Sequence, residues 1–171
     1  MTIRFRASSA IDRMDREQAK NVTVCLMQSC HVSDVAAIES LCFAEPWSEK
    51  SLGLLLSDGA VAFVARDGER AVAYGGMLCV AGEGQITNVA THPDYRRCGL
   101  ARKVLAALLQ YARENDLFEV SLEVRESNEA AIALYGAYGF SICGTRRNFY
   151  KQPTENALVM VWRREENTDC V

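Results

Sequence analysis

Residues 96–102 read Arg-Arg-Cys-Gly-Leu-Ala-Arg and lie directly before a stretch with helical periodicity. The first four N–H groups of a helix lack partners within the helix and carry the positive end of its dipole, so a phosphate placed there accepts several hydrogen bonds. Gly99 and Ala101 are small enough for the backbone to approach a diphosphate closely, and three arginines add positive charge. This segment, called the basic loop below, therefore predicts a diphosphate-binding site.

Other phosphate-binding motifs do not describe the basic loop. It lacks the Gly-Lys-Ser/Thr of a Walker loop, and it is not the Gly-x-Gly-x-x-Gly of a dinucleotide-binding fold. Taken alone, the segment also fits an ordinary basic helix start on the protein surface. The choice between a diphosphate site and an ordinary helix start depends on the strands and helices around the basic loop.

The elements that would position the basic loop follow from hydrophobic patterning. Apolar and β-branched runs predict seven strands, at residues 22–27, 60–66, 71–80, 85–91, 118–124, 140–145 and 157–163. Helical periodicity and capping residues predict four helices, at about residues 33–42, 48–57, 99–114 and 128–138. Glycine-bearing turns at 67–70 and 82–84 make residues 60–91 an antiparallel meander. The order β-α-α-β-β-β-α-β-α-β-β predicts an α+β (mixed α/β) domain.

Composition and charge narrow the class of protein. A chain of 171 residues with 49% hydrophobic residues predicts one domain, at residues 22–164, between tails at 1–21 and 165–171. Met14 is an alternative translation start within the first tail. The net charge of −3 argues against a broad basic surface for nucleic acid. No apolar run reaches the roughly 20 residues of a membrane span, and no signal-peptide pattern precedes the domain.

The cysteines and histidines predict no chemistry of their own. Seven irregularly spaced cysteines, without a Cys-x-x-Cys pair, predict small buried side chains in a reducing, cytoplasmic compartment. His31 and His92 have no ligand-like spacing to a cysteine pair, so no metal site is expected. We expect turn or cap roles for both histidines.

Several motifs together resemble the GCN5-related N-acetyltransferase (GNAT) superfamily over about residues 22–164. They are Arg-x-x-Gly-x-Ala opening a long helix, Leu-Glu-Val at 122–124 ending the next strand, Asn128, and Ala-Leu-Tyr-x-x-x-Gly-Phe at 133–140. Pro-Trp-Ser-Glu-Lys at 46–50 and Arg-Arg-Asn-Phe-Tyr at 146–150 further resemble the RimI-type ribosomal-protein alanine N-acetyltransferases. The resemblance implies a GNAT fold, with a twisted, mostly antiparallel central sheet flanked by about four helices. It also implies acetyl-CoA as the donor, and no metal.

The resemblance also implies roles for individual residues. Acetyl transfer from a thioester to an amine needs a neutral amine, a polarised carbonyl and a proton for the departing thiolate. By resemblance Glu123 is the general base and Tyr135 the acid that protonates the thiolate, whereas a surface carboxylate and a core aromatic are the structural alternatives. Acetyl-CoA is expected to contact a strand end, the basic loop and a helix cap, through Val89, Ala90, Thr91, Arg97, Cys98, Gly99, Leu100, Ala101, Arg102 and Asn128.

The acceptor amine is less closely defined. By resemblance Trp47 and Tyr150 line a groove for a protein substrate, although both also suit core or rim positions, and Glu45 replaces the family's common phenylalanine. A free α-amino group titrates about 2.5 units below lysine, a difference of about 3.4 kcal/mol, which favours an N-terminal amine for a single glutamate base.

Three hypotheses stay open. The first is acetylation of a protein N-terminus, by resemblance that of the alanine-starting small-subunit ribosomal protein eighteen. The second is acetylation of a small-molecule amine by the same site. The third is a non-catalytic acyl-CoA-binding module.

Overall fold

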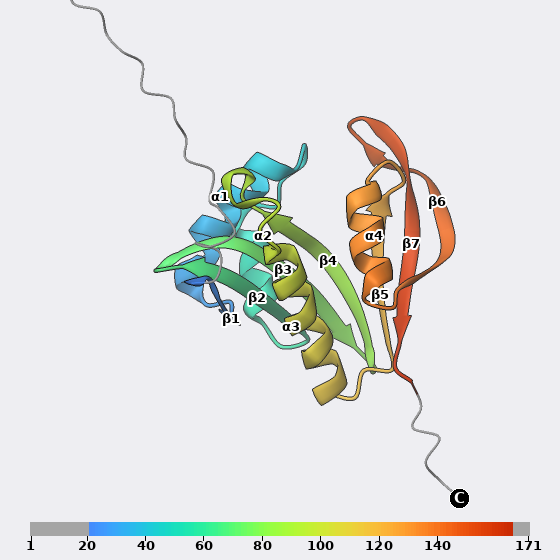
Figure 1. Cartoon of the computed structure of the whole chain (residues 1–171), viewed down its shortest axis with the longest axis horizontal. Coiled ribbons are helices and arrows are strands. Elements are labelled where there is room, and N and C mark those ends of the chain that lie inside the picture. Colours follow the sequence, from blue (N-terminus) through green and yellow to red (C-terminus); the bar gives the residue numbers. More distant parts are fainter. Residues whose placement is uncertain (1–20, 166–171) are drawn as a thin grey trace, which may run out of the picture.

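Figure 1 shows the computed structural model, which describes residues 21–165. Residues 1–20 and 166–171, with most of the two predicted tails and Met14, lie outside the described residues. Within them the chain forms four helices, α1 Val32–Cys42, α2 Glu49–Gly53, α3 Leu100–Glu114 and α4 Glu129–Ala137. Three short 3-10 helices cover Ser29–His31, Leu54–Leu56 and Pro93–Tyr95.

All seven strands of the described chain belong to one sheet. They are β1 Thr23–Leu26, β2 Ala60–Asp67, β3 Arg70–Val80, β4 Glu83–Thr91, β5 Glu119–Arg125, β6 Ser141–Lys151 and β7 Thr154–Arg163. The order across the sheet is β1-β2-β3-β4-β5-β7-β6, with β4 and β5 parallel and every other neighbouring pair antiparallel. The predicted mixed α/β class and the mostly antiparallel sheet are confirmed.

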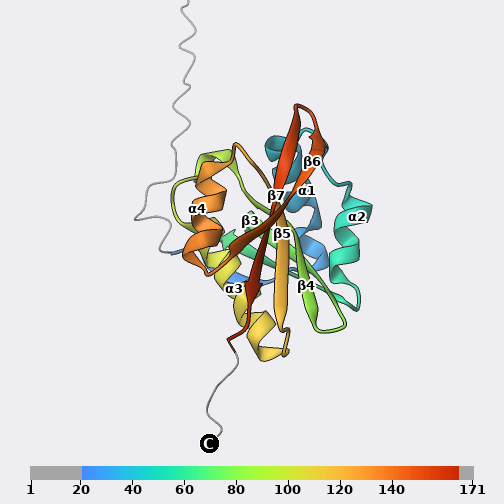
Figure 2. The ribbon, with the colours of Figure 1, turned by 90° about the vertical axis from the view of Figure 1, so that its right-hand side faces the viewer.

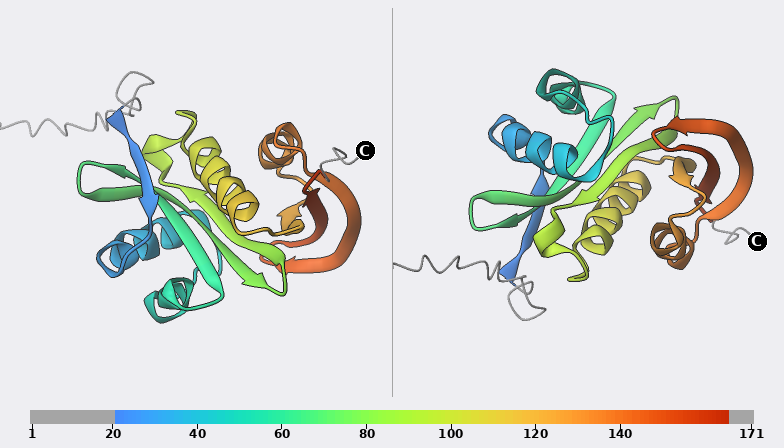
Figure 3. Two further views of the ribbon diagram at one scale, coloured as in Figure 1. Left: turned by 90° about the horizontal axis from the view of Figure 1, so that it is seen from below. Right: turned by 90° about the horizontal axis from the view of Figure 1, so that it is seen from above.

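The helices cover both faces of the sheet. Figure 2 shows α3 and α4 on one side and α1 and α2 on the other, and Figure 3 shows the sheet end-on with β1 and β6 at its opposite edges. The long α3 buries its apolar stripe against the middle strands, through Leu105, Leu108 and Leu109. Helix α1 packs Val35 and Ile38 on the other face. The centre of the sheet is therefore covered by helices on both faces.

Most predicted elements agree with the structure to within two residues, and the larger differences concern one helix and the last two strands. The helix predicted at 48–57 is α2 followed by a 3-10 turn, Leu54–Leu56. The strands predicted at 140–145 and 157–163 are longer and form a β6–β7 hairpin that turns at Gln152 and Pro153. Most β6 residues are exposed, so the strand has little of the apolar alternation that marks a half-buried strand in a sequence.

Both histidines have the local roles that were predicted for them. The Gln28 N–H donates to His31 Nδ1 at 3.0 Å, and the Asp94 N–H donates to His92 Nδ1 at 3.3 Å. The prediction of buried cysteines is wrong for the described residues, because four of the six are half-buried and Cys30 and Cys143 are exposed. Among residues 21–165, no disulfide joins the cysteines and no group of three His, Cys, Asp or Glu side chains could hold a metal ion. No helix in this range is long and apolar enough to cross a membrane.

Candidate active site

Strands β4 and β5 pair along only part of their length. The parallel ladder joins Glu83–Ile86 to Glu119–Leu122, after which β4 continues to Thr91 and β5 to Arg125 without pairing to each other. Figure 1 shows the two strands diverging from this point. The two strands therefore splay apart, and Glu123 is the first residue of β5 beyond the paired segment.

The diverging edge of β4 presents polar groups that the sheet does not pair. The His92 N–H donates to Val72 O on the β3 side at 2.9 Å. Because N–H direction alternates along an antiparallel edge, the amides of Val89 and Thr91 point away from β3, toward the side from which β5 has departed. Thr91 Oγ1 is also buried without a hydrogen-bond partner. A ligand with acceptor and donor groups fits this edge, because buried polar groups are almost always paired.

The basic loop has the geometry of an anion site. Gly99 is the N-cap of α3 with φ of 79°, no side chain caps the helix, and its first turn contains no acidic residue. The first helical hydrogen bond runs from Lys103 N–H to Gly99 O, so the N–H groups of the preceding helical residues, Leu100 to Arg102, have no partner inside the helix. Arg97 also has a left-handed φ, 66°. Successive amides in such conformations turn toward a common point and bind anions.

Glu123 lies between two polar side chains where the strands separate. Its neighbours Leu122 and Val124 are buried on the α3 face, so its own side chain, only 13% exposed, lies on the opposite face. Gln85 Nε2 donates to Oε2 at 3.4 Å, and Arg146 Nη2 lies 3.2 Å from Oε1. The Glu123 carboxylate is thus oriented by one amide and one guanidinium at the start of the splay.

Tyr150 connects the β6–β7 hairpin to the end of β5. Its hydroxyl donates to the Glu123 backbone carbonyl at 3.3 Å, and Arg125 lies over its ring at 4.1 Å. Burial raises the pKa of Tyr150, and the positive charge of Arg125 partly opposes this shift. Tyr150 thus borders Glu123, whereas Trp47 is half-buried and bound to Glu39 of α1.

The arrangement of splayed strands and a basic helix start is that of a known family. The model of the acetyltransferase (GNAT) family matches residues 32–140. The chain belongs to this family. Enzymes of the family take their acetyl group from acetyl-CoA.

The acetyltransferase is also similar to individual proteins over most of its length. Ribosomal protein bS18-alanine N-acetyltransferase of Escherichia coli strain K12 is 35% identical over 141 residues, which are 78% of this chain and 94% of that relative. A crystal structure of the ribosomal-protein-S18-alanine N-acetyltransferase from Escherichia coli has a TM-score of 0.80 and 29% identity, covering 88% and 99% of the two chains. Ard1 from Thermoplasma volcanium has a TM-score of 0.77 and 25% identity, covering 85% and 99%.

Tyr135 of the acetyltransferase is a buried phenol in the last turn of α4. It is 8% exposed and its ring packs on Phe140 at a centroid distance of 5.7 Å. Burial, and to a smaller extent the neighbouring Tyr150, raises its pKa to about 12. The phenol therefore stays protonated at neutral pH and can donate a proton, and the packing role expected as an alternative is present at the same time.

Asn128 has the capping role that was one of its two predicted roles. Its Oδ1 accepts a hydrogen bond from the Ala131 N–H at 3.2 Å and so closes the first turn of α4. This fixes the start of the helix that carries Tyr135. A contact between Asn128 and acetyl-CoA stays a prediction, as do the cofactor contacts of Val89, Ala90, Thr91 and the basic loop.

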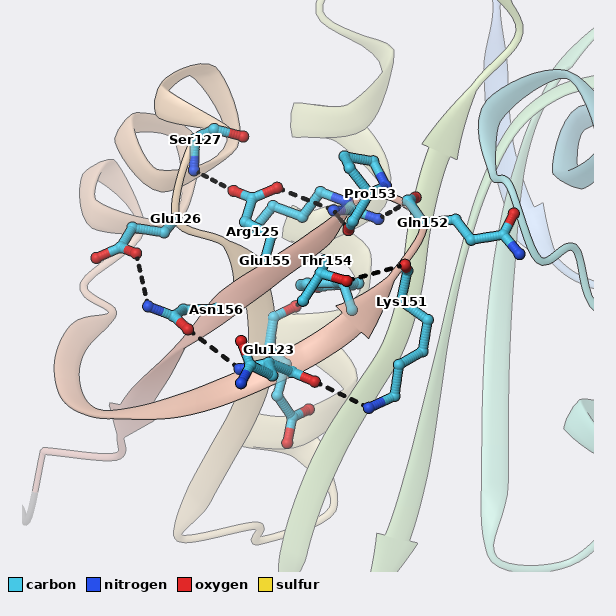
Figure 4. Close-up of polar contacts among 12 residues, drawn as sticks. Glu123, Arg125, Glu126, Ser127, Lys151, Gln152, Pro153, Thr154, Glu155 and Asn156 are labelled. Carbon is cyan, nitrogen blue, oxygen red and sulfur yellow. Dashed lines mark hydrogen bonds and ion pairs between the residues drawn. The ribbon is translucent and has the colours of Figure 1, made fainter.

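The sequence prediction missed Arg125 and Glu155, which hold the β6–β7 hairpin against the site (Figure 4). Arg125 pairs with Glu155 at 2.9 Å and donates to the carbonyls of Gln152 and Pro153 at the hairpin turn. Glu155 also accepts from the Ser127 N–H at 2.6 Å. The only signal in the sequence is that Arg125 follows the Leu-Glu-Val of β5, because its partners lie about 30 residues later and come together only through strand pairing.

Proposed function

We propose that this acetyltransferase transfers the acetyl group of acetyl-CoA to the N-terminal α-amino group of alanine in ribosomal protein bS18. The observation that carries the proposal is the 35% identity to the Escherichia coli enzyme of that name, which extends over 94% of the relative's length.

The chain offers one set of groups for each part of the donor. The free amides that open α3, with Arg97 and Arg102 beside them, would hold the diphosphate. The outward amides of Val89 and Thr91 would receive the pantetheine arm and bring one N–H to the acetyl carbonyl. When bound, acetyl-CoA supplies an activated thioester, and the splay between β4 and β5 gives the amine access to it.

Glu123 and Tyr135 would move the two protons of the reaction. The Glu123 carboxylate accepts a proton from the attacking amine, directly or through one water, because it lies at the point where β4 and β5 diverge, with Arg146 beside it. Tyr135 donates its proton to the departing thiolate. An unperturbed phenol has a pKa of about 10 and a thiol one of about 8.5. The raised pKa of Tyr135 therefore delays proton transfer until negative charge develops on the sulfur.

An α-amino group suits this site better than a lysine side chain. The reference pKa of an α-amino group, about 7.7–8.0, leaves a useful neutral fraction at pH 7, whereas lysine at about 10.4 has almost none. A single carboxylate base such as Glu123 can therefore deprotonate an α-amino group, whereas a lysine side chain would need a further group that lowers its pKa.

We also propose that residues 22–164 are the catalytic domain and that the enzyme acts in the cytoplasm, where its cysteines stay reduced.

Steady-state acetylation of a panel of acceptors tests the proposed function. The panel contains the N-terminal peptide of bS18 from the same organism, the same peptide with a blocked N-terminus and an added lysine, and a polyamine. We expect acetylation of the first alone, located on the α-amino group by fragment mass spectrometry and accompanied by equimolar CoA release. Preferential acetylation of the polyamine would instead support the small-molecule hypothesis, and acetyl-CoA binding without turnover would support the binding module.

A further inference from the structure

Glu39 in α1 is a fully buried carboxylate outside the proposed catalytic pair. Its residue is 0% exposed. Oε2 accepts from the Trp47 backbone N–H at 2.8 Å, and Oε1 accepts from Asn88 Nδ2 at 2.8 Å and from the Tyr74 hydroxyl. Asn88 Nδ2 also lies 3.1 Å from the Tyr74 oxygen, so the four groups form one connected network.

The Glu39 carboxylate has hydrogen-bond donors around it but no counter-ion among the described residues. Among residues 21–165, no Lys, Arg or His side chain lies within salt-bridge distance of Glu39. A buried carboxylate without a counter-ion depends on its hydrogen bonds, since desolvation strongly disfavours the charged form. An apolar side chain of the same size would fill this site without the desolvation cost of a carboxylate. The network therefore points to a role in positioning the groups that Glu39 binds rather than in stability.

The three donors come from three different parts of the molecule. Tyr74 belongs to β3, Asn88 to β4, and Trp47 to the Trp47 loop, which we define as residues 43–48 between α1 and α2. Asn88 directly precedes Val89, whose outward amide is assigned to the donor side of the site. Cys42, the last residue of α1, adds a second link to the same strand, because its Sγ donates to Thr91 O at 3.4 Å.

The loop depends on Glu39 more than β4 does. Strand β4 is held along its length by the ladder to β3, from Ala73↔Thr91 to Val80↔Glu83. Residues 43–48 belong to no helix or strand, and all but Trp47 are exposed. A hydrogen bond from a backbone N–H to a buried carboxylate is among the stronger contacts in a protein, and here it fixes the residue that carries the indole.

We propose that Glu39 is a positioning residue that fixes the Trp47 loop against β4. It thereby sets the position of the Trp47 indole, which is assigned to the peptide, relative to the thioester. Glu39 itself does not touch either substrate, because it is completely buried. It acts through the Trp47 backbone on one side and through Asn88 on the other. The inference rests on the proposed function, since it assigns the Trp47 loop to the peptide.

Kinetics of a double-mutant cycle test the inference. Glu39→Met keeps the volume but removes the acceptor, and Trp47→Ala removes the indole. We expect E39M to raise the KM for the bS18 peptide about tenfold and to leave the KM for acetyl-CoA within about twofold, because β4 keeps its ladder. In the W47A background the same change should raise the peptide KM by less than about twofold, since two residues that act through one contact are not additive.

Asp34→Leu is the matched control. Asp34 lies on the same helix, and its carboxylate likewise accepts a backbone N–H, that of Ala71 at 2.9 Å, but at the end of α1 away from the Trp47 loop. D34L should lower the melting temperature as E39M does and leave both KM values unchanged. If E39M is not folded, Glu39→Gln, which retains one acceptor oxygen for two groups of donors, should raise the peptide KM about threefold.

Three results would overturn the inference. They are an unchanged peptide KM in the folded Glu39 variants, an equal rise in both KM values, and additive effects of E39M and W47A. Failure of the proposed function is seen separately, because it appears as the absence of peptide acetylation by the wild-type enzyme.

Discussion

Gly99→Ala tests whether the backbone conformation of the basic loop serves acetyl-CoA binding. Gly99 has φ of +79°, and a methyl group added there would meet no atom within 4 Å. The substitution therefore adds no clash, and its only cost is the left-handed backbone, roughly 1–2 kcal/mol for a residue with a side chain. If bound acetyl-CoA requires this conformation, the same free energy is lost from binding.

The expected result is a rise in the KM for acetyl-CoA of about 5- to 30-fold, because about 1.4 kcal/mol corresponds to a factor of ten. The KM for the peptide and the turnover number at saturating acetyl-CoA should change little. Steady-state kinetics with acetyl-CoA as the varied substrate, together with direct titration by calorimetry, measure the effect on binding.

Gly59→Ala is the matched control for Gly99→Ala. Gly59 also has φ of +79°, and an added methyl group would lie 3.5 Å from Cys79 O, which is an ordinary contact. Gly59 precedes β2 and lies outside the proposed site. G59A should therefore lose stability by the same backbone mechanism and bind acetyl-CoA normally. The reasoning fails if G99A binds acetyl-CoA as tightly as the wild type while its melting temperature falls like that of G59A.

Three further predictions concern single side chains. Glu123→Gln should lower kcat about 10²- to 10⁴-fold, as expected for loss of a general base, whereas Glu119→Gln on the same strand should not; equal activities would remove Glu123 from the mechanism. Tyr135→Phe should lower kcat at least about 100-fold with little change in either KM, and Tyr111→Phe in α3 is its control; unchanged turnover in Y135F would leave only the packing role. Hydrogen bonds from Ser127 and the Arg125 charge lower the pKa of Glu155 from 4.5 to about 2, so the contribution of Glu155 to stability is complete above pH 4.5 and is lost as the pH falls through 2. The melting temperatures of the wild type and Glu155→Gln should therefore differ most above pH 4.5 and converge toward pH 2. A difference that stays constant with pH would contradict this.

The tightly held hairpin has a consequence for how the site is assembled. Arg125 stands two residues after Glu123, and its guanidinium binds the β6–β7 turn while it lies over the Tyr150 ring. Tyr150 in turn donates to the Glu123 backbone. The proposed base, the hairpin and the aromatic wall are thus joined through one arginine, whose planar guanidinium can make these contacts at once where a lysine ammonium could not.

The sequence alone determined most of the fold. Helix α3 could be predicted because its apolar residues recur at helical spacing and the basic loop precedes it, and the meander β2–β4 because glycine-bearing turns separate apolar runs. The basic loop is local in the chain, so the residues that create its conformation are neighbours in the sequence. The family resemblance added Glu123 and Tyr135, which patterning could not separate from a surface carboxylate and a core aromatic.

Only the tertiary structure decided which side chains meet around the site. The Arg125–Glu155 pair and the Glu39 network join residues that are between 8 and 49 positions apart, and nothing in the local pattern marks their partners. Glu39 itself lies in an apolar helix face, where a sequence gives no sign that three donors surround it. Such contacts depend on strand order, register and the crossing of helices over the sheet, which are set by the packing of the whole domain. The splay of β4 and β5 belongs to the same class, since it depends on where two strands stop pairing.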